Sequence, residues 1–446
     1  MAILIKKELK GWGNFPKKIV KVQFPPDKKS INLNIKGSII ARGMGRSYGD
    51  CSFNKNHTVD MLSINRILNF DKKKGIISVE AGVTLKDVLE LVVKHGWFPP
   101  VSPGTKYVTI GGMVACDVHG KNHHNSGSFS NFVKEIEIIN ASRKIKKCSR
   151  KINSKLFRKT IGGMGLTGII TEVKFQLLKI ESSYIKQEVS NYLSLSNLME
   201  KFEKEKSQEY SVAWLDLTSY NKSKGYLKSV FFMGKHAKKR ELKSIKNKEN
   251  KLNFNDKDIK FPIGILKLFI SNLTIYIFNL LYILKNQPSK KIVHFNKFFY
   301  PLDGIKNWNK IYGKEGFLQY QFVVPKKNSY KTLELIFEVI KSKKCYPTLA
   351  VLKLMGKESI GYLSFAKSGY TLALDFPANE KSKSILILFD KIIKENDGSI
   401  YLAKDSRMNK KTFRDISKKS IQLFSNEKKR KDQLSFSSFQ SLRLGI

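Results

Sequence analysis

Three glycine-rich segments in the first part of the chain constrain its fold most strongly. They are ARGMGRSYGD (Ala41–Asp50), PGTKYVTIGGMVACDVHGKNHH (Pro103–His124) and GGMGLTGII (Gly162–Ile170). Glycine permits positive φ and close backbone approach, so such loops can expose their N–H groups to a ligand. One loop alone is equally typical of a tight β-turn. Three of them together predict one extended ligand, with a pyrophosphate among the amides and a flat ring near the small residues.

The secondary structure around these loops excludes a dinucleotide-binding Rossmann domain. The first loop has the spacing G-x-G-x3-G, and no helix follows it directly. A helix is predicted at Thr84–His95, with Thr84 as its N-cap and Gly96 at its end. Short strands are predicted at Ser38–Ala41, Gly75–Glu80, Val133–Asn140 and Glu172–Leu177. These elements do not form regular βαβ units, which disfavours a doubly wound parallel sheet.

The net charge of the chain is unusual. Lys and Arg total 82 against 37 Asp and Glu, which gives +45, and only 11 of the 82 are arginine. Because arginine normally accompanies nucleic-acid recognition, dedicated DNA or RNA binding is disfavoured. Two interpretations stay open. The lysines form a solvated surface, or they attract an anionic lipid or substrate.

The cysteines and the start of the chain indicate a reducing compartment. Cys51, Cys116, Cys148 and Cys345 lie far apart in sequence, without metal or redox spacing. A chain of 446 residues needs no disulfides to stabilise its core. The first residues contain only a short apolar run, so we expect no signal peptide.

One apolar segment interrupts the middle of the chain. Pro262–Leu284 carries a single charge, Lys267, and is long enough to span a membrane. Asn272, Ser271 and Asn279 interrupt it, however. Three interpretations stay open: a segment at a membrane interface or over the substrate, buried core, or a membrane span.

Three histidines cluster after the second glycine loop. His119, His123 and His124 have spacing that could bind zinc on a helix, but Gly120 and Gly127 argue against a helix there. Structural histidines and contacts to a cofactor or substrate are the other interpretations.

The last third alternates predicted strands, at Leu318–Val324 and Tyr370–Phe376, with predicted helices at Ser329–Lys341 and Lys383–Asn396. Gln319 and Gln321 alternate with apolar residues, so both face one side of their strand and can bind sugar hydroxyls. Lys404, in YLAKDSR, is either a surface lysine or a charged residue of the site.

Ten motifs occur in a familiar order: ARGMGRSYGD, PGTKYVTIGGMVACDVHGKNHH, GSFSNFV, GGMGLTGII, SVAWLD, YPLD, GFLQYQFVVP, KLMG, LDFP and YLAKDSR. In this composite the chain resembles the decaprenylphosphoryl-β-D-ribose 2'-oxidase family of the vanillyl-alcohol oxidase superfamily. The resemblance covers nearly the whole chain from Gly11 onwards.

The resemblance implies an α+β fold of two domains. An FAD-binding domain would comprise residues 1–182, a sheet-based substrate domain residues 183–398, and a segment at 399–446 would return to the FAD domain. Many superfamily members tether FAD through a histidine in the first loop. Arg46 stands in that position here, which implies non-covalent FAD. Thr371 and Ala373 stand where the family has Asn and Cys.

The implied reaction is oxidation of the 2'-hydroxyl of a polyprenyl-phosphoryl ribose to the 2'-ketone. This is the first half of an epimerisation to arabinose for cell-envelope glycans. An aldonolactone or other sugar-alcohol oxidase of the same superfamily is the alternative. The implied partners are a lipid-linked sugar phosphate, a separate NAD(P)H-dependent keto-sugar reductase and the membrane surface, without nucleic acid. The implied location is cytoplasmic, peripheral to the inner membrane, and no metal is implied.

The family's site residues transfer onto matching positions of this chain. Lys404, His119 and Tyr48 would be catalytic, with Lys404 as the electrostatic group. Lys121, Trp214, Gln319, Gln321, Lys353 and Lys404 would bind the substrate. The FAD contacts would be Ala41, Arg42, Gly43, Met44, Gly45, Arg46, Ser47, Tyr48, Gly49, Asp50, Cys51, Gly104, Thr109, Ile110, Gly111, Gly112, Cys116, Asp117, Val118, His119, Ile170 and Tyr401.

Overall fold

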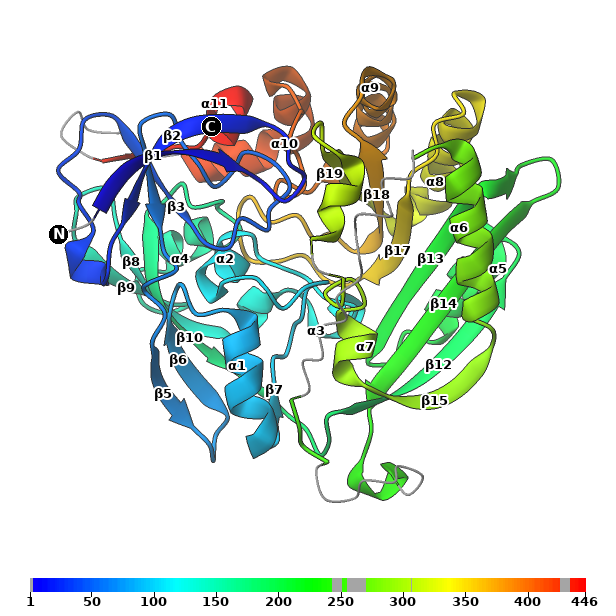
Figure 1. The fold of residues 1–446 in the computed structure, drawn as a ribbon, viewed down its shortest axis with the longest axis horizontal. Coiled ribbons are helices and arrows are strands. Elements are labelled where there is room, and N and C mark those ends of the chain that lie inside the picture. Colours follow the sequence, from blue (N-terminus) through cyan, green and yellow to red (C-terminus); the bar gives the residue numbers. More distant parts are fainter. Residues whose placement is uncertain (1–2, 243–250, 255–269, 306, 426–433) are drawn as a thin grey trace.

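The structure is a computed structural model that describes residues 3–242, 251–254, 270–305, 307–425 and 434–446 (Figure 1). Two five-stranded sheets occupy one side of the molecule and an eight-stranded sheet the other, as Figure 1 shows. Helices α2 (Ile110–Ala115) and α3 (His123–Ser126) lie between the two sides.

The first sheet has the order β1-β2-β4-β3-β20 and is mixed. Its first pair is antiparallel and the other three pairs are parallel. The C-terminal strand β20 therefore completes a sheet that the N-terminus begins. Its strands are β1 (Ile3–Lys10), β2 (Lys17–Phe24), β3 (Ser38–Arg42), β4 (His57–Asp60) and β20 (Ser435–Phe436).

The second sheet is antiparallel, with the order β5-β6-β10-β8-β9. Its inner face packs with α1 (Leu85–Val92) and α2 in one hydrophobic core. Its strands are β5 (Ile67–Asp71), β6 (Ile76–Glu80), β10 (Ile169–Gln176), β8 (Val133–Ile139) and β9 (Ile145–Cys148). Helix α4 (Ser154–Thr160) leads into the third glycine loop, and β7 (Trp97–Phe98) pairs with β11 (Leu178–Lys179).

The third sheet is also antiparallel, with the order β15-β12-β14-β13-β17-β18-β16-β19. Its strands are β15 (Ser289–His294), β12 (Tyr184–Tyr192), β14 (Tyr226–His236), β13 (Tyr210–Asn221), β17 (Leu349–Met355), β18 (Gly369–Pro377), β16 (Phe317–Pro325) and β19 (Ser399–Ile400).

The two faces of this third sheet are covered differently. One face packs into a large core with α5 (Leu195–Lys204), α8 (Lys326–Ser342) and α9 (Glu380–Glu395). On the other face, Trp214, Val230 and Leu349 pack against Tyr282 and Ile283 of α6 (Asn272–Lys285). Helix α7 (Phe295–Phe299) follows β15, and α10 (Lys410–Ser425) and α11 (Phe439–Leu444) end the chain.

The local predictions with clear physical signals are confirmed. Thr84 caps α1 through a capping box with Asp87, and Gly96 takes the left-handed conformation after the last turn. Each predicted strand overlaps an observed one, and the mainly antiparallel sheets confirm that the doubly wound fold is absent from the described residues. The four cysteines are free thiols.

The apolar segment Pro262–Leu284 lies partly outside the described residues, since the description resumes at residue 270. Its described part forms α6, capped by Ser271. Only Ile275 and Asn279 of this helix are buried, so the described part is not core. No helix in the described ranges is long and apolar enough to cross a membrane.

Candidate active site

The three glycine loops meet at one place. Gly43 of the first loop touches Thr109 of the second so closely that a Cβ would overlap the Thr109 hydroxyl. Met164 of the third loop donates its backbone N–H to Ala115 O at 2.9 Å. The sequence prediction that these loops serve one ligand therefore has the necessary geometry.

The first loop is held by the side chains of Arg42 and Asp50, and the Arg42 guanidinium also lies against Gly45, where a Cβ would overlap it. Arg42 donates to Lys10 O at 2.7 Å and to Ser52 Oγ at 2.9 Å, and Asp50 pairs with Arg443 at 2.7 Å. These contacts leave the backbone exposed, because the N–H groups of residues 45–47 find no acceptor among the described residues. Arg46 stacks over the Trp12 ring at 3.9 Å.

The segment Tyr401–Arg407, which we call the strap, crosses the first loop. Tyr48 donates its N–H to Ala403 O at 2.9 Å, and Gly49 lies against the Asp405 carbonyl, where a Cβ would overlap the oxygen. Tyr401 donates its hydroxyl to Cys116 O at 3.0 Å, which ties the strap to the second loop. The strap thereby places the Lys404 ammonium 3.8 Å above the centre of the Tyr48 ring.

The third sheet presents polar residues to the same place in three cross-strand rows. The paired residues are Gln319 with Asp375, Gln321 with Ala373, and Thr371 with Lys353. Directly opposite residues share a face of the sheet, so all six lie on one face. This confirms that Gln319 and Gln321 face the same side.

His119 joins the second glycine loop to this sheet. The side-chain amide of Gln321 lies 2.9 Å from His119 Nε2 and 3.1 Å from Thr371 Oγ1. Burial, together with the Lys353, His123 and Lys404 charges, holds the pKa of His119 well below its usual range. The ring is therefore neutral, so Nε2 accepts a hydrogen bond from the Gln321 amide N–H.

The other two histidines point to different partners. His123 Nδ1 accepts the backbone N–H of Gly356 at 3.0 Å, and His124 Nε2 lies 2.9 Å from Gln208 O. In the described part of the chain, no group of three His, Cys, Asp or Glu side chains could hold a metal ion. The structure thus favours structural roles for His123 and His124.

Two further lysines lie near one another at this site, since the Lys353 charge acts on both Lys121 and His119. Lys121 donates to the carbonyl of Phe298 and lies 4.4 Å from the centre of the Phe298 ring. Lys353 has no hydrogen-bond acceptor and no carboxylate partner among the described residues. Burial lowers the pKa of Lys353 to about 8, and burial with the neighbouring Lys353 charge lowers that of Lys121 to about 7.

Comparison with known proteins identifies the family of this chain. A family model described as an FAD binding domain matches residues 34–149, which contain the first two glycine loops. The decaprenylphosphoryl-β-D-ribose oxidase of Mycolicibacterium smegmatis is 33% identical over 423 residues, covering 91% of this chain and 90% of the relative. The chain belongs to the decaprenylphosphoryl-β-D-ribose oxidase family. It is an FAD-dependent oxidoreductase with an FAD-binding fold of the vanillyl-alcohol oxidase type.

More distant relatives match smaller parts of the chain or at lower identity. An uncharacterized protein in the mprA 5' region of Streptomyces coelicolor is 26% identical over 335 residues, which is 73% of this chain and 90% of that protein. The Delta(24)-sterol reductase of Homo sapiens is 26% identical over 157 residues, 35% of this chain and 30% of the reductase.

The residues present fit the FAD of this oxidase family. The first loop offers free backbone N–H groups at residues 45–47, where two phosphates need donors. Gly104 has open space around the position of a Cβ, and Gly45 has a positive φ of 62°. The side chains of Asp50 and Asp117 are engaged elsewhere, Asp117 with Ser364 at 2.8 Å. The carboxylates of these two acids are therefore not available to a cofactor.

Trp214 lies at the edge of the site rather than beside Lys404. Its strand β13 is separated from β16, which carries Gln321, by β17 and β18. Its ring packs 4.6 Å from that of Tyr282 in α6, and its Nε1 is buried without a partner among the described residues. Helix α6 therefore covers one flank of the face that carries the candidate substrate residues.

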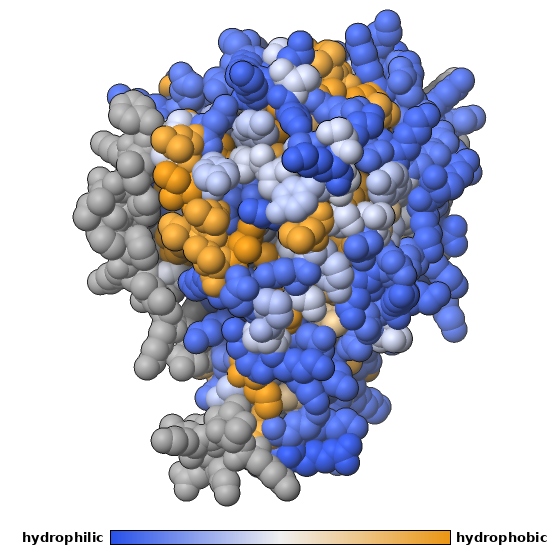
Figure 2. All heavy atoms as spheres, turned by 90° about the vertical axis from the view of Figure 1, so that its right-hand side faces the viewer, coloured by the Kyte–Doolittle hydropathy of each residue, from blue (hydrophilic) through white to orange (hydrophobic). Residues whose placement is uncertain are grey.

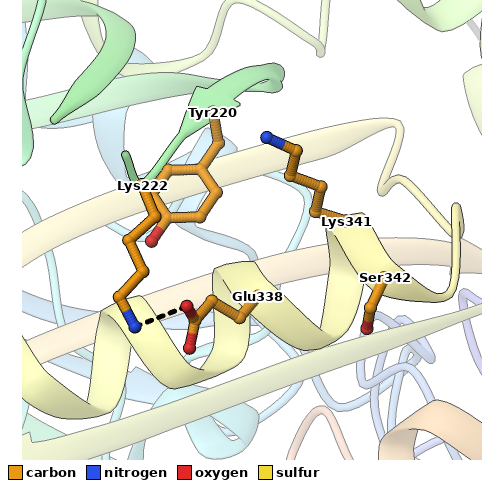
Figure 3. Close-up of a pocket in the computed structure, with 5 residues that line it drawn as sticks. All are labelled: Tyr220, Lys222, Glu338, Lys341 and Ser342. Atoms are coloured by element: carbon orange, nitrogen blue, oxygen red, sulfur yellow. Dashed lines mark ion pairs between the residues drawn. The ribbon is translucent and has the colours of Figure 1, made fainter. Parts of the chain in front are cut away.

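A hollow elsewhere on the surface is separate from this site. It has a volume of about 340 Å³ and lies between the end of β13 and α8, on the side of the sheet that packs against the large core (Figure 3). Lys222 and Glu338 form an ion pair at 2.5 Å across it. No candidate site residue lines it; its lining is Tyr220, Lys222, Glu338, Lys341 and Ser342.

The sequence interpretation missed two residues that the structure places at the site. Asp375 of the LDFP motif lies beside Gln319, and Arg443 near the C-terminus pairs with both Asp50 and Asp405. Asp375 had a signal, since it follows Thr371 and Ala373 at the strand's two-residue period. Arg443 had none, because its partners are distant in sequence.

Proposed function

We propose that this protein oxidises the 2'-hydroxyl of a polyprenyl-phosphoryl ribose to the 2'-ketone, the first half of an epimerisation to arabinose for cell-envelope glycans. The observation that carries this proposal is the meeting of Lys121 and Lys353 with Gln321 and His119 beside the glycine loops. Two cations without carboxylate partners suit an anionic ligand, and the amide and imidazole suit hydroxyl groups. The similarity to the M. smegmatis oxidase supports the same substrate class.

When bound, FAD supplies the acceptor for the hydride that leaves the carbinol carbon, while the hydroxyl proton is lost to a base or water. The chain's own residues hold the alcohol in position and stabilise charge. Lys404, above Tyr48, offsets the negative charge that the flavin ring gains with the hydride. Gln321 orients the sugar, and neutral His119 fixes the Gln321 amide and lines the pocket.

The phosphodiester of the substrate binds to Lys353 and Lys121. Burial lowers the pKa of both Lys121 and Lys404, and the Lys353 charge lowers each further, so Lys353 acts on both other lysines. We therefore expect the pentose near Lys404 and Gln321, and the phosphate near Lys353 and Lys121, toward α7. A bound phosphate would raise the pKa of both phosphate-binding lysines and restore their charge.

The FAD is held without a covalent bond, in a domain of residues 1–182 completed by 399–446, with residues 183–398 as the substrate domain. The position that carries the tethering histidine in other superfamily members is Arg46, which stacks on Trp12. The pairing of β20 with β3 supports the return of the C-terminal segment to the first sheet. Acid precipitation should release all of the flavin into the supernatant.

The protein binds the cytoplasmic surface of the inner membrane through α6. Seven large apolar side chains of this helix are between 39% and 66% exposed. They form part of the orange patch on the left of the face in Figure 2. They are Leu273, Tyr276, Ile277, Phe278, Leu280, Leu281 and Leu284. Lys285, Lys290 and Lys291 follow, and basic residues at a membrane surface attract anionic headgroups.

The 2'-ketone leaves this protein and passes to a separate NAD(P)H-dependent reductase, which returns hydride to the opposite face of the carbon. This step is needed because a single oxidation gives a ketone rather than the epimer.

The test is product analysis with purified, flavin-loaded protein and a synthetic polyprenyl-phosphoryl ribose. We expect bleaching of the flavin on anaerobic mixing and a product lighter by two hydrogen atoms, which borohydride converts to a mixture of ribose and arabinose. Bleaching only by a free aldose, with peroxide and a lactone formed in air, would assign the chain to the sugar-oxidase alternative. Absence of bound flavin would contradict the proposal entirely.

A further inference from the structure

Asp375 is a buried carboxylate that the reaction described above does not use. It lies in β18 and is 1% exposed. Its Oδ1 accepts a hydrogen bond from Gln319 Nε2 at 2.5 Å, and its Oδ2 has no hydrogen-bond partner among the described residues. Burying a charged oxygen without a partner is costly, so such an atom normally has a compensating charge nearby.

The groups that face Asp375 come from four elements. Tyr48 comes from the first glycine loop, Tyr312 from the turn before β16, Gln319 from β16 and Lys404 from the strap. Lys404 is the cation among them; its charge acts on Asp375 although the two side chains form no direct ion pair. Lys404 also has Cys116, Lys353, His119 and Tyr48 as neighbours. None of these four is a carboxylate, so Asp375 is the carboxylate that acts on Lys404.

Lys404 differs from the other two buried lysines in this respect. Burial lowers the pKa of all three, but only for Lys404 does a carboxylate, Asp375, raise it again. Lys121 and Lys353 gain a counter-charge only when an anionic ligand binds. Lys404 must stay charged through the catalytic cycle if it is to stabilise the reduced ring.

We propose that Asp375 is a positioning residue, the fixed counter-ion that keeps the Lys404 ammonium charged. Asp375 has this role toward Lys404 rather than toward the sugar. The inference rests on the proposed function only in the role given to Lys404. It predicts that removing the Asp375 charge makes Lys404 lose its proton at lower pH, since a buried ammonium without a carboxylate is destabilised.

The test uses Asp375→Asn in the flavin-loaded protein, with sulfite as the probe. Sulfite adds to the oxidised flavin ring, and a cation beside the ring stabilises the negative charge of the adduct. We expect sulfite affinity in the wild type to fall as pH rises through the deprotonation of Lys404. In Asp375→Asn this fall should occur at a lower pH, by one unit or more, so that affinity at pH 8 is about tenfold weaker.

The matched control is Asp397→Asn, which removes an exposed carboxylate from a residue with a positive φ of 57° that asparagine tolerates. It should keep the wild-type pH profile. A fall at the wild-type pH in flavin-loaded Asp375→Asn would overturn the proposal.

A second measurement does not depend on that variant folding. If Asp375 and Lys404 compensate each other, removing the lysine should leave Asp375 protonated at neutral pH. Infrared difference spectra of Lys404→Gln against the wild type should show a new carboxylic acid C=O band, and its absence would also overturn the proposal. Neither readout needs the sugar, so a protein that fails to oxidise polyprenyl-phosphoryl ribose would contradict the proposed function without affecting this test.

Discussion

The Lys404 ammonium lies 3.8 Å above the centre of the Tyr48 ring, and this contact joins the strap to the first glycine loop. The strap is fixed independently, because Tyr48 donates its backbone N–H to Ala403 O and Tyr401 bonds Cys116 O. Loss of the Lys404 side chain should therefore leave the strap in place. What it removes is the charge at the site.

We predict that Lys404→Ala retains FAD and folds normally but loses turnover. Losing one group that stabilises charge developing in the transition state costs about 10²–10³ in rate. Rapid-reaction measurement of flavin bleaching by the lipid-linked ribose gives this rate directly. Lys411→Ala, which removes an exposed lysine of α10, is the control and should bleach at the wild-type rate. Bleaching of Lys404→Ala within about threefold of the wild type would contradict the assigned role.

Substrate affinity should decline in alkaline solution. Burial lowers the pKa of Lys353 to about 8, so this ammonium is lost as pH rises through that value, and Lys121 follows the same sign from about 7. A charge-assisted hydrogen bond contributes about 1.5–3 kcal/mol, so KM should rise by about 10–100-fold per cation lost. Measuring KM from pH 6 to 9.5 tests this.

Lys353→Met should raise KM at pH 7 and flatten this pH dependence, because one titrating cation has been removed. An uncharged alkyl riboside should show little dependence on pH in the wild type. Equal pH dependence for the charged and uncharged substrates would show that these lysines do not bind the phosphate.

Gly49→Ala should displace the strap. A Cβ on this residue would overlap the backbone carbonyl oxygen of Asp405, which cannot move without moving the strap. Overpacking of this kind costs about 1–3 kcal/mol, so thermal unfolding should occur at lower temperature and flavin bleaching should slow. Gly304→Ala is the control, because the nearest atom to its Cβ would be Pro301 O at 3.9 Å. An unchanged bleaching rate in Gly49→Ala would show that the strap's position is not critical.

Arg443→Met should destabilise the fold at neutral pH. Arg443 bonds Asp50 at 2.7 Å and Asp405 at 3.0 Å, and both carboxylates are buried. Removing one partner of a buried ion pair costs about 3–5 kcal/mol, measurable by urea unfolding of the flavin-loaded protein. Arg443→Lys, which keeps the charge, should lose less stability than Arg443→Met.

The effect of Arg443→Met should shrink in acid. Burial raises the pKa of Asp405, but Arg443 and the Met408 N–H lower it further, so its net pKa is below the ordinary value. The stability from this lowered pKa is present above the unfolded pKa of about 3.9 and is lost as pH falls through the folded pKa. A difference in the free energy of unfolding between Arg443→Met and the wild type that stays constant down to pH 3 would contradict this origin.

The double variant Phe278→Ser/Leu281→Ser should float poorly with anionic liposomes. Both side chains are more than half exposed on α6. Each would contribute up to about 1.5–3 kcal/mol if fully buried in lipid, so partitioning should fall at least about tenfold. The matched control is Ile387→Ser/Leu423→Ser, on α9 and α10, which should float like the wild type. Equal flotation of all three proteins would remove α6 from membrane binding.

Local structure followed from the sequence where a few neighbouring residues determine it. Helix α1 has its cap at Thr84, its apolar face and its terminal Gly96 within thirteen positions, and all three were predicted. The shared face of Gln319 and Gln321 followed from strand alternation alone. The prediction that the glycine loops serve one ligand also came from local spacing, and the structure brings the loops together.

Features that depend on distant residues did not follow. Asp50 is separated from Arg443 by 393 positions, and no pattern links them. For α6, hydrophobicity all round the helix left open whether it was core, surface or span, and only the packing partners Trp214 and Val230 show which flank is buried. Strand alternation could have shown that Asp375 shares a face with Thr371. It could not have shown that Asp375 lies near Lys404, which comes from another part of the chain.

Strand β20 and helix α11 are synthesised after the residues that they contact, so the first sheet is completed late in synthesis. Strand β3, which leads into the first glycine loop, is flanked on one side by β4 and on the other by β20, from the end of the chain. Asp50, at the end of that loop, likewise forms its ion pair only once Arg443 has been synthesised. The first loop therefore gains these contacts only after residues 435–446 have been synthesised, so we expect flavin capture to follow that step.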